Sequence, residues 1–117
     1  MIASKLNLKA GMTCAVLNMP SDIALDFGSD IGNAQPKKAD AVIGFARVHA
    51  DIARFLQAVV EAARQDRIAW IAYPKGGKLG TDLNRDILGG SLTAESLRPV
   101  RQISIDDTWS ALRFRPA

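Results

Sequence analysis

Apolar residues fall into short unbroken runs at three places in the chain. These runs read TCAVLNM at 13–19, DAVIGFA at 40–46 and RIAWIAY at 67–73. Short runs of this kind are typical of strands buried on both faces of a parallel sheet. Further on, PVRQISI and SALRFR flank the polar turn DDTW, and apolar and polar residues alternate in the second of them. This pattern predicts an antiparallel hairpin near residues 99–115.

One stretch, residues 50–64, has the spacing of an amphipathic helix. Its apolar positions recur every three or four residues, at Ile52, Phe55, Leu56, Val59, Val60 and Ala63. We expect a second helix from Thr81, with Leu83, Ile87 and Leu88 facing inward. Gly89 and Gly90 are poor helix formers and predict that this helix ends near Leu88. A short helix is expected at 21–28, where SDIALDFG has a capping residue at its start and a glycine at its end.

The order of these elements predicts a single α/β domain over residues 1–117. We expect a Rossmann-like fold of two or three layers. Its mostly parallel sheet would have about five strands in the order 1-2-3-5-4, with the fifth strand antiparallel between the third and the fourth. Right-handed crossovers would place both longer helices on one face of the sheet. The other face would then be a large exposed apolar patch, and so a homodimer is expected.

Composition restricts the class of protein. The chain has 117 residues, of which 48% are hydrophobic and 23% are charged, as is usual for a soluble globular domain. No apolar run approaches the length of a membrane helix, and the first residues do not resemble a secretory signal. Cys14 is the one cysteine, which predicts a reduced, unreactive thiol in a cytoplasmic protein. With one histidine and one cysteine, the familiar zinc sites are excluded.

The formal net charge is +3, which by itself indicates no particular partner. Basic residues are spread along the sequence and form no dense block, so nucleic acid is not an expected partner. No membrane partner is expected either.

The stretch YPKGGKLGTDLNRD, residues 73–86, is the first candidate for a site. It does not match a phosphate-binding P-loop, because Leu79 follows Gly77-Lys78 and Ala72 stands where the first glycine is required. A glycine-rich turn before a helix N-terminus still exposes amide groups that attract anions. The candidate anion-binding residues are Lys75, Gly76, Gly77, Lys78, Thr81 and Arg85. The alternative is a solvated turn in which Thr81 is an ordinary helix N-cap.

The hairpin turn holds a second candidate cluster, formed by Asp106, Asp107 and Trp109. Paired carboxylates can serve acid–base chemistry, but aspartate also occurs in turns for conformational reasons. We expect a structural role, with the acids bonded to the turn or to an arginine, Arg85 or Arg101. His49 has no identifiable nucleophile or acid as a partner, so no catalytic residue is assigned. All these candidates follow strand ends that meet at the carboxyl edge of a parallel sheet.

Several of these segments resemble a family of short bacterial proteins of unknown function. The resemblance rests on AYPKGGKLGTDLNRD, LRPVRQ and IDDTWSALRFRPA, with the shared motifs Y-P-K, T-D-x-x-R-D and D-D-x-W-S-A-x-R-F. The opening KLNLKAGMTCAVLNMP is similar as well, so the likeness spans nearly the whole chain. It implies no activity. Gly89 and Gly90 depart from it, since bulky apolar residues are expected there.

The order of elements is also similar to the C-terminal half of Rossmann-like methyltransferases. The cofactor half is missing, since NMPSDIALD follows the first strand without a G-x-G-x-x-G motif. No cofactor is therefore expected, S-adenosylmethionine (SAM) included.

Three interpretations of function follow. The first is a cytoplasmic, non-catalytic binding domain for an anionic ligand or a protein partner at the carboxyl edge. The second is an enzyme acting on a phosphorylated or carboxylated small molecule, with Lys75, Arg85 and Asp107 around it. The third is a structural subunit.

Overall fold

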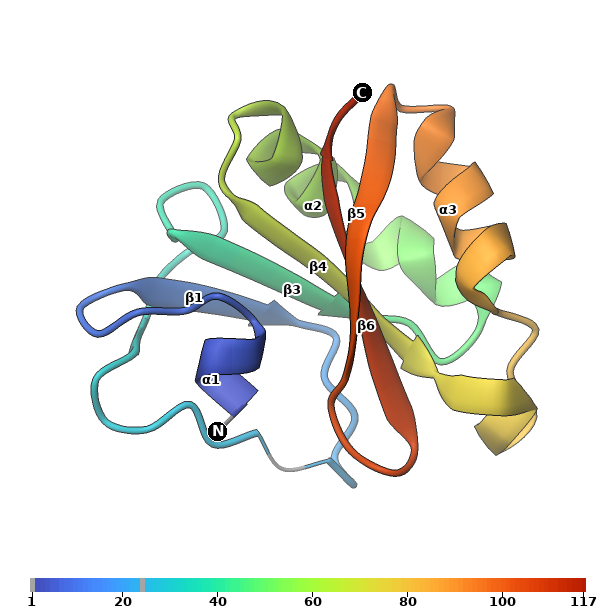
Figure 1. Cartoon of the computed structure of the whole chain (residues 1–117), viewed down its shortest axis with the longest axis horizontal. Helices are drawn as coiled ribbons and strands as arrows, with labels where there is room; N and C mark the ends of the chain where they lie inside the picture. Colours follow the sequence, from blue (N-terminus) through green and yellow to red (C-terminus); the bar gives the residue numbers. More distant parts are fainter. Residues whose placement is uncertain (1, 24) are drawn as a thin grey trace.

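A computed structural model describes residues 2–23 and 25–117, which are built around one mixed sheet (Figure 1). Its strands follow the order β2-β1-β3-β4-β6-β5. The first four of these in space pair in parallel, whereas β6 is antiparallel to both of its neighbours. The strands are β1 Thr13–Leu17, β2 Gly32–Asn33, β3 Ala41–Phe45, β4 Ile68–Pro74, β5 Leu97–Ser104 and β6 Trp109–Pro116.

The predicted class is therefore confirmed: an α/β fold with a mostly parallel sheet and a C-terminal antiparallel hairpin. The sheet has six strands rather than about five, because the two-residue strand β2 pairs with the outer side of β1. The strand order differs from the predicted one by this added edge strand. A strand of two polar residues has no apolar run by which the sequence could reveal it.

The helical segments are α1 Ile2–Lys5, the 3₁₀-helix η1 His49–Arg54, α2 Leu56–Arg64, the 3₁₀ segment η2 Lys75–Gly80 and α3 Arg85–Thr93. The helix predicted over 50–64 is thus divided between η1 and α2. The break falls at Phe55, whose backbone leaves the helical region with φ −134° and ψ 1°. Its ring lies against Gly44, where a built Cβ would come within 2.3 Å of the ring. Within the described residues, no helix is long and apolar enough to span a membrane.

The second predicted helix was wrong at both ends. It begins at Arg85 rather than at Thr81, and it continues through Gly89 and Gly90 to Thr93. Gly89 is buried, and a built Cβ there would lie 3.6 Å from the Pro99 ring, so the bare backbone packs closely on β5. Because the helix starts four residues later, its inward face also shifts. Leu88 and Leu92 are fully buried, whereas Ile87, expected inside, is 45% exposed.

The helix predicted over 21–28 is also absent from the structure as described. Ala24, inside that range, lies outside the described residues, and those on either side form turns and extended chain. The carboxylate of Asp26 accepts a hydrogen bond from the amide of Gly28 at 2.8 Å, a local turn that competes with a helix. Ile23, Leu25 and Phe27 all pack against the sheet.

The sheet has two differently covered faces. On the helical face, η1, α2 and α3 enclose one core cluster; its largest members include Phe55, Val59, Ile71, Leu88, Leu92 and Phe114. On the other face, called here the second face, α1 and the segments around β1 lie over a separate cluster (Figure 1). That cluster contains Leu6, Leu8, Cys14, Ile23, Ala41, Ile43, Phe45, Trp70, Ala72, Trp109 and Ala111. The indole N–H of Trp70 donates to the carbonyl of Leu6 at 3.0 Å and fixes this cover.

The cover on the second face removes the argument from which a homodimer was predicted. Ile43 and Trp70 are each 1% exposed in the single chain, so these strands present no open apolar patch. The homodimer itself stays an untested prediction.

Candidate functional site

Lys75, Lys78 and the hairpin turn lie together at the edge of the sheet where the parallel strands end. Asn18 follows β1, and its side-chain amide donates to the carbonyl of Phe45 at the end of β3, at 2.9 Å. The amide of Lys75, just after β4, donates to the carbonyl of Thr108 in the hairpin turn at 2.8 Å. The C-terminal ends of β1, β3 and β4 therefore lie beside the first residue of β6.

The glycine-rich corner, residues 75–80, is held against the hairpin by its two lysines. The ammonium group of Lys75 donates to the hydroxyl of Ser104 at 2.6 Å, and that of Lys78 donates to the carbonyl of Asp107 at 2.8 Å. Gly76 and Gly77 have φ of 52° and 76°, in the left-handed region that favours glycine. The two predicted lysines thus link the glycine-rich corner to the C-terminal hairpin.

Thr81 is not the helix cap that the sequence predicted. Its hydroxyl accepts a bond from the amide of Leu83 at 3.0 Å, which closes a short turn before the helix. Asn84 caps α3 instead, with its side-chain oxygen accepting from the amide of Ile87 at 2.8 Å. The glycine-rich corner therefore does not lead directly into a helix N-terminus, and the helix dipole that was expected to attract an anion lies several residues away.

Arg85 stands apart from the two lysines, exposed in the first turn of α3. It lies near Tyr73: burial raises the pKa of the tyrosine, and the charge of Arg85 partly opposes that rise. The anion-binding role of the corner stays a prediction. An NMR titration of the amides of residues 76–82 with phosphate would test it.

In the hairpin turn the structural role falls to Asp106. Its carboxylate oxygen Oδ1 accepts from the amides of Thr108 and Trp109, at 2.8 and 2.7 Å. The carbonyl of Asp107 accepts the hydrogen bond from the ammonium group of Lys78. The acids were expected to bond to the turn or to an arginine, Arg85 or Arg101, and for Asp106 the partner is the turn backbone. Trp109 is 2% exposed, and its ring meets that of Phe45 edge-on with centroids 5.5 Å apart.

His49 has a partner that the sequence did not reveal. Its Nε2 lies 3.0 Å from the hydroxyl of Ser91, which in turn donates to the carbonyl of Ile87 at 3.1 Å. Because that second bond uses the only proton of the hydroxyl, Nε2 is the donor toward Ser91. A donating imidazole cannot remove a proton from that serine, so the pair is not an activated nucleophile. The two residues are 42 positions apart, too far for any local pattern.

Cys14 is buried on the second face, as predicted for an unreactive thiol. It is 2% exposed, and burial raises its pKa to about 12. At neutral pH the thiol is therefore protonated and inaccessible. In the described part of the chain, no three histidine, cysteine, aspartate or glutamate residues lie close enough together to hold a metal ion.

A cleft of about 630 Å³ lies beside helix α2 and is called here the α2 cleft. Its floor is apolar and includes Leu17, Phe55 and Ala58. Its rim is polar and mainly basic, formed by Gln35, Lys37, Lys38, Arg54, Gln57, Glu61 and Arg67. A second, smaller hollow of about 380 Å³ is lined by His49, Ala50, Ile52, Ala53, Leu56 and Ser91. Lys75, Arg85 and Asp107 line neither of them.

Arg67 builds one wall of the α2 cleft. Its Nη1 donates to the carbonyls of Pro36 and Ala39, at 2.7 and 2.8 Å, and its Nε donates to Gln65 at 2.9 Å. These bonds hold the loop before β3 and so position Lys37 and Lys38, which are exposed. On the opposite side, the side chain of Arg54 is 71% exposed and lies 3.8 Å from Asp51. Sequence reasoning missed this site because its residues come from separate segments.

Comparison with solved structures gives a likeness in fold, whereas the other two comparisons give no match. No family model matches the chain, and no curated protein matches its sequence. The resemblance to a family of short bacterial proteins stays a prediction. A solved structure of LepI in complex with SAM has a similar fold, with a TM-score of 0.51 and 14% identity. The match covers 99% of this chain and 39% of the LepI chain.

This likeness shows the fold, a type of which LepI is a SAM-bound example, and raises the question of whether SAM fits here. The residues do not suit it. The turn after β1 lacks a glycine-rich sequence, and the amide of Asn18 is bonded across that turn to Phe45. In the α2 cleft, Lys37 and Lys38 would repel the positively charged sulfonium group of SAM.

Proposed function

We propose that the chain is a small, non-catalytic binding domain for an anionic molecule with an apolar body, held in the α2 cleft. One observation carries the proposal, the combination of an apolar floor with a basic rim in one hollow. At about 630 Å³ the α2 cleft falls within the range of about 300 to 1,000 Å³ common for small-molecule sites.

The charges of the rim indicate which end of the ligand binds there. Lys37, Lys38 and Arg54 are exposed around the opening, whereas Glu61 is the one acid among the lining residues and is half-buried. Arg67 is committed to backbone carbonyls and acts as a positioning residue. The ligand's apolar part would lie over Ala58 and Phe55, with a carboxylate, sulfonate or phosphate at the lysines.

This proposal keeps the predicted binding of an anion but moves it from the glycine-rich corner to another part of the molecule. Lys75 and Lys78 already bond the hairpin, so an anion there would have to compete with those bonds. Among the described residues, the only ion pair made by Lys37, Lys38 or Arg54 is the 3.8 Å contact between Arg54 and Asp51. The cytoplasmic location remains a prediction from the single reduced cysteine.

Fluorescence of 8-anilino-1-naphthalenesulfonate, an aromatic anion, tests the site. We expect the native protein to bind it and decanoate to displace it. Lys37→Glu/Lys38→Glu should weaken binding about tenfold or more through charge reversal at the rim. Ala58→Trp should abolish binding by filling the floor. The matched control is Lys9→Glu/Arg47→Glu, which changes the net charge equally at exposed positions outside the cleft.

Binding that is unchanged in both cleft variants, or reduced equally in the control, would remove the proposal. The Lys37/Lys38 variant alters only exposed side chains, so its folded state can be verified by circular dichroism even if Ala58→Trp does not fold.

A further inference from the structure

The C-terminal hairpin carries four arginines that lie opposite one another in two pairs. The register of β5 and β6 sets Arg98 against Arg115 and Arg101 against Arg113. Directly opposed residues of an antiparallel pair project from the same face of the sheet. In a regular strand, residues three apart point to opposite faces. Here a register shift between Pro99 and Arg101 inserts one residue, so that both pairs share a face.

That face is the second face of the sheet. Arg113 lies opposite Trp70 of β4, and the Trp70 side chain belongs to the second-face cluster. Arg113 is half-buried beside Asn7, and the other three arginines are exposed. These four residues, Arg98, Arg101, Arg113 and Arg115, are called here the arginine face. It lies at the opposite edge of the sheet from β1, which contributes to the α2 cleft.

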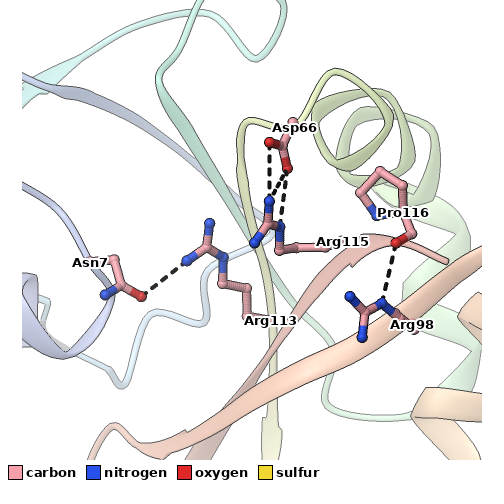
Figure 2. Close-up of polar contacts among 6 residues, drawn as sticks. All are labelled: Asn7, Asp66, Arg98, Arg113, Arg115 and Pro116. Atoms are coloured by element: carbon pink, nitrogen blue, oxygen red, sulfur yellow. Dashed lines mark hydrogen bonds and ion pairs between the residues drawn. The ribbon is translucent and has the colours of Figure 1, made fainter.

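The positive charge of the arginine face is only partly balanced. Asp66 makes a bidentate ion pair with Arg115, in which the shortest distance, between Nη2 and Oδ1, is 3.0 Å (Figure 2). Arg113 donates to the neutral side chain of Asn7 at 3.2 Å, and Arg98 donates to the carbonyl of Pro116 at 3.3 Å. Across residues 2–23 and 25–117, no salt bridge is found for Arg98, Arg101 or Arg113.

One hydrogen-bond donor of the Arg113 side chain lacks an acceptor among the described residues. Its Nε is buried and has no hydrogen-bond partner among the described residues. Burial, then the neighbouring charge of Arg115, lowers the pKa of Arg113, while Asp66 acts in the opposite direction. Like charges placed directly opposite in a sheet are destabilising, and an anion between them relieves that repulsion. An oxyanion with several oxygens would supply both the charge and further acceptors for the group.

We propose that the arginine face binds an extended chain of phosphates. Guanidinium groups bind phosphate through two parallel hydrogen bonds, a geometry that lysine cannot provide. The two pairs follow one another along β6 at a separation of two residues, about 7 Å. A linear polyanion can therefore meet one pair after the other. The phosphates can belong to single-stranded nucleic acid or to inorganic polyphosphate.

Recognition would involve the phosphates and not the bases. The exposed residues next to the arginines on β5 are Pro99, Val100 and Gln102, none of which offers an aromatic surface for base stacking. Binding should therefore be independent of base sequence and sensitive to salt. Nucleic acid was not an expected partner, because the basic residues form no dense block in the sequence. The four arginines come from two strands, and only the bulge aligns them.

Arginine and proline on an edge strand have a simpler use, which is to prevent pairing with another sheet. That role depends on charge alone and is retained when lysine replaces arginine. Phosphate binding through the two parallel hydrogen bonds of a guanidinium group is not retained when lysine replaces arginine. Arg98→Lys/Arg101→Lys therefore separates the two roles, and we expect it to weaken phosphate binding by about threefold or more while the protein stays monodisperse.

The main test is fluorescence anisotropy of a labelled oligo-dT, with unlabelled inorganic polyphosphate as competitor. Wild-type binding should decline with salt, with a slope of log affinity on log salt of about −2 to −3 for four phosphate contacts. Arg98→Glu/Arg101→Glu should weaken binding about tenfold or more, because it removes the net positive charge. In this variant each glutamate lies opposite a remaining arginine and can pair with it, so the hairpin is preserved.

The control Lys9→Glu/Arg47→Glu carries the same charge change and should retain binding. Binding of oligo-dT alone, of polyphosphate alone or of both supports the proposal and identifies the source of the phosphates. Three results would overturn it: no binding of either at low salt, an equal loss in the control, or equally tight binding of poly-glutamate. Full retention of affinity in Arg98→Lys/Arg101→Lys would show that charge alone accounts for binding and would overturn recognition through the guanidinium groups.

Discussion

The two faces of the sheet reach similar burial by different means. On the helical face, Val59 and Val60 lie on a regular helix and are buried at helical spacing. On the second face, Leu6, Leu8 and Ile23 come from irregular chain outside any helix or strand, yet they are buried almost as completely. The comparison shows that an apolar sheet face can be covered without a long helix. A face that lacks helices is therefore not necessarily an interface.

The largest effect should come from removing the ring that joins η1 to α2 on the helical face. Phe55→Ala is expected to lower the free energy of unfolding by about 3 to 5 kcal/mol, because it leaves a cavity against Gly44. Chemical denaturation measures the change. Gly44→Ala should be strongly destabilising alone but much less so in the Phe55→Ala background, where the clash is gone. Equal effects of Gly44→Ala in both backgrounds would contradict this packing.

The matching substitution on the second face is Leu6→Ala. We expect a loss of about 2 to 3 kcal/mol, toward the lower end for a buried leucine, since the cover can open locally without global unfolding. Hydrogen exchange should show faster exchange in α1 and β1 than in α2. If sedimentation instead revealed a wild-type dimer that this substitution dissociates, the second face would be an interface after all.

Asp106 and Asp107 allow a paired test of the turn that places Trp109 in the second-face cluster. Asp106→Ala should cost about 1 to 3 kcal/mol, because the backbone amides of Thr108 and Trp109 lose their acceptor. Asp107→Ala should stay within about 0.5 kcal/mol, as its carbonyl and not its side chain makes the contact. The reverse order in urea denaturation would mean that the turn is held differently.

Cys14 should give the second face a distinct response to pH. Its folded-state pKa of about 12 lies above the ordinary value of 9.0 for a cysteine thiol, so the folded protein retains a proton that the unfolded chain releases. The free energy of unfolding is therefore unaffected by this group below pH 9. It declines as pH rises toward 12, by up to about 1.4 kcal/mol per pH unit. Cys14→Ala should show a shallower decline between pH 9 and 10.5. Identical slopes would indicate that the thiol is more accessible than the structure places it.

The sequence predicted those parts of the fold in which local pattern and tertiary burial agree. The three apolar runs became β1, β3 and β4, and the alternation in SALRFR became β6. Prediction of secondary structure was wrong where a local residue pattern is compatible with more than one conformation. Gly89 was read as a helix breaker, but its lack of a side chain allows α3 to approach Pro99. Ile23, Leu25 and Phe27 were read as helical, although their spacing of two suits an extended segment.

The candidate sites were harder to predict, because each gathers residues that are distant in the chain. The carboxyl edge was placed correctly from topology alone. The use of its lysines was not, since Lys75 and Lys78 bond a hairpin about thirty residues further along. The α2 cleft combines Leu17, Lys37 and Ala58, and the arginine face depends on one bulge. Neither arrangement leaves a periodic or spaced motif.

The position of β6 has a consequence for the order in which the sheet can form during synthesis. β5 leaves the ribosome before β6, but in the sheet it pairs only with β6, which separates it from β4. A nascent chain that ends near residue 104 therefore has a strand with no partner and a parallel sheet whose last edge, β4, is open. Synthesis proceeds at about 5 to 20 residues per second, so this state persists for roughly a second. During that interval the open edge of β4, with its apolar Ile71 and Ala72, lacks the hydrogen-bonding partner that β6 later provides.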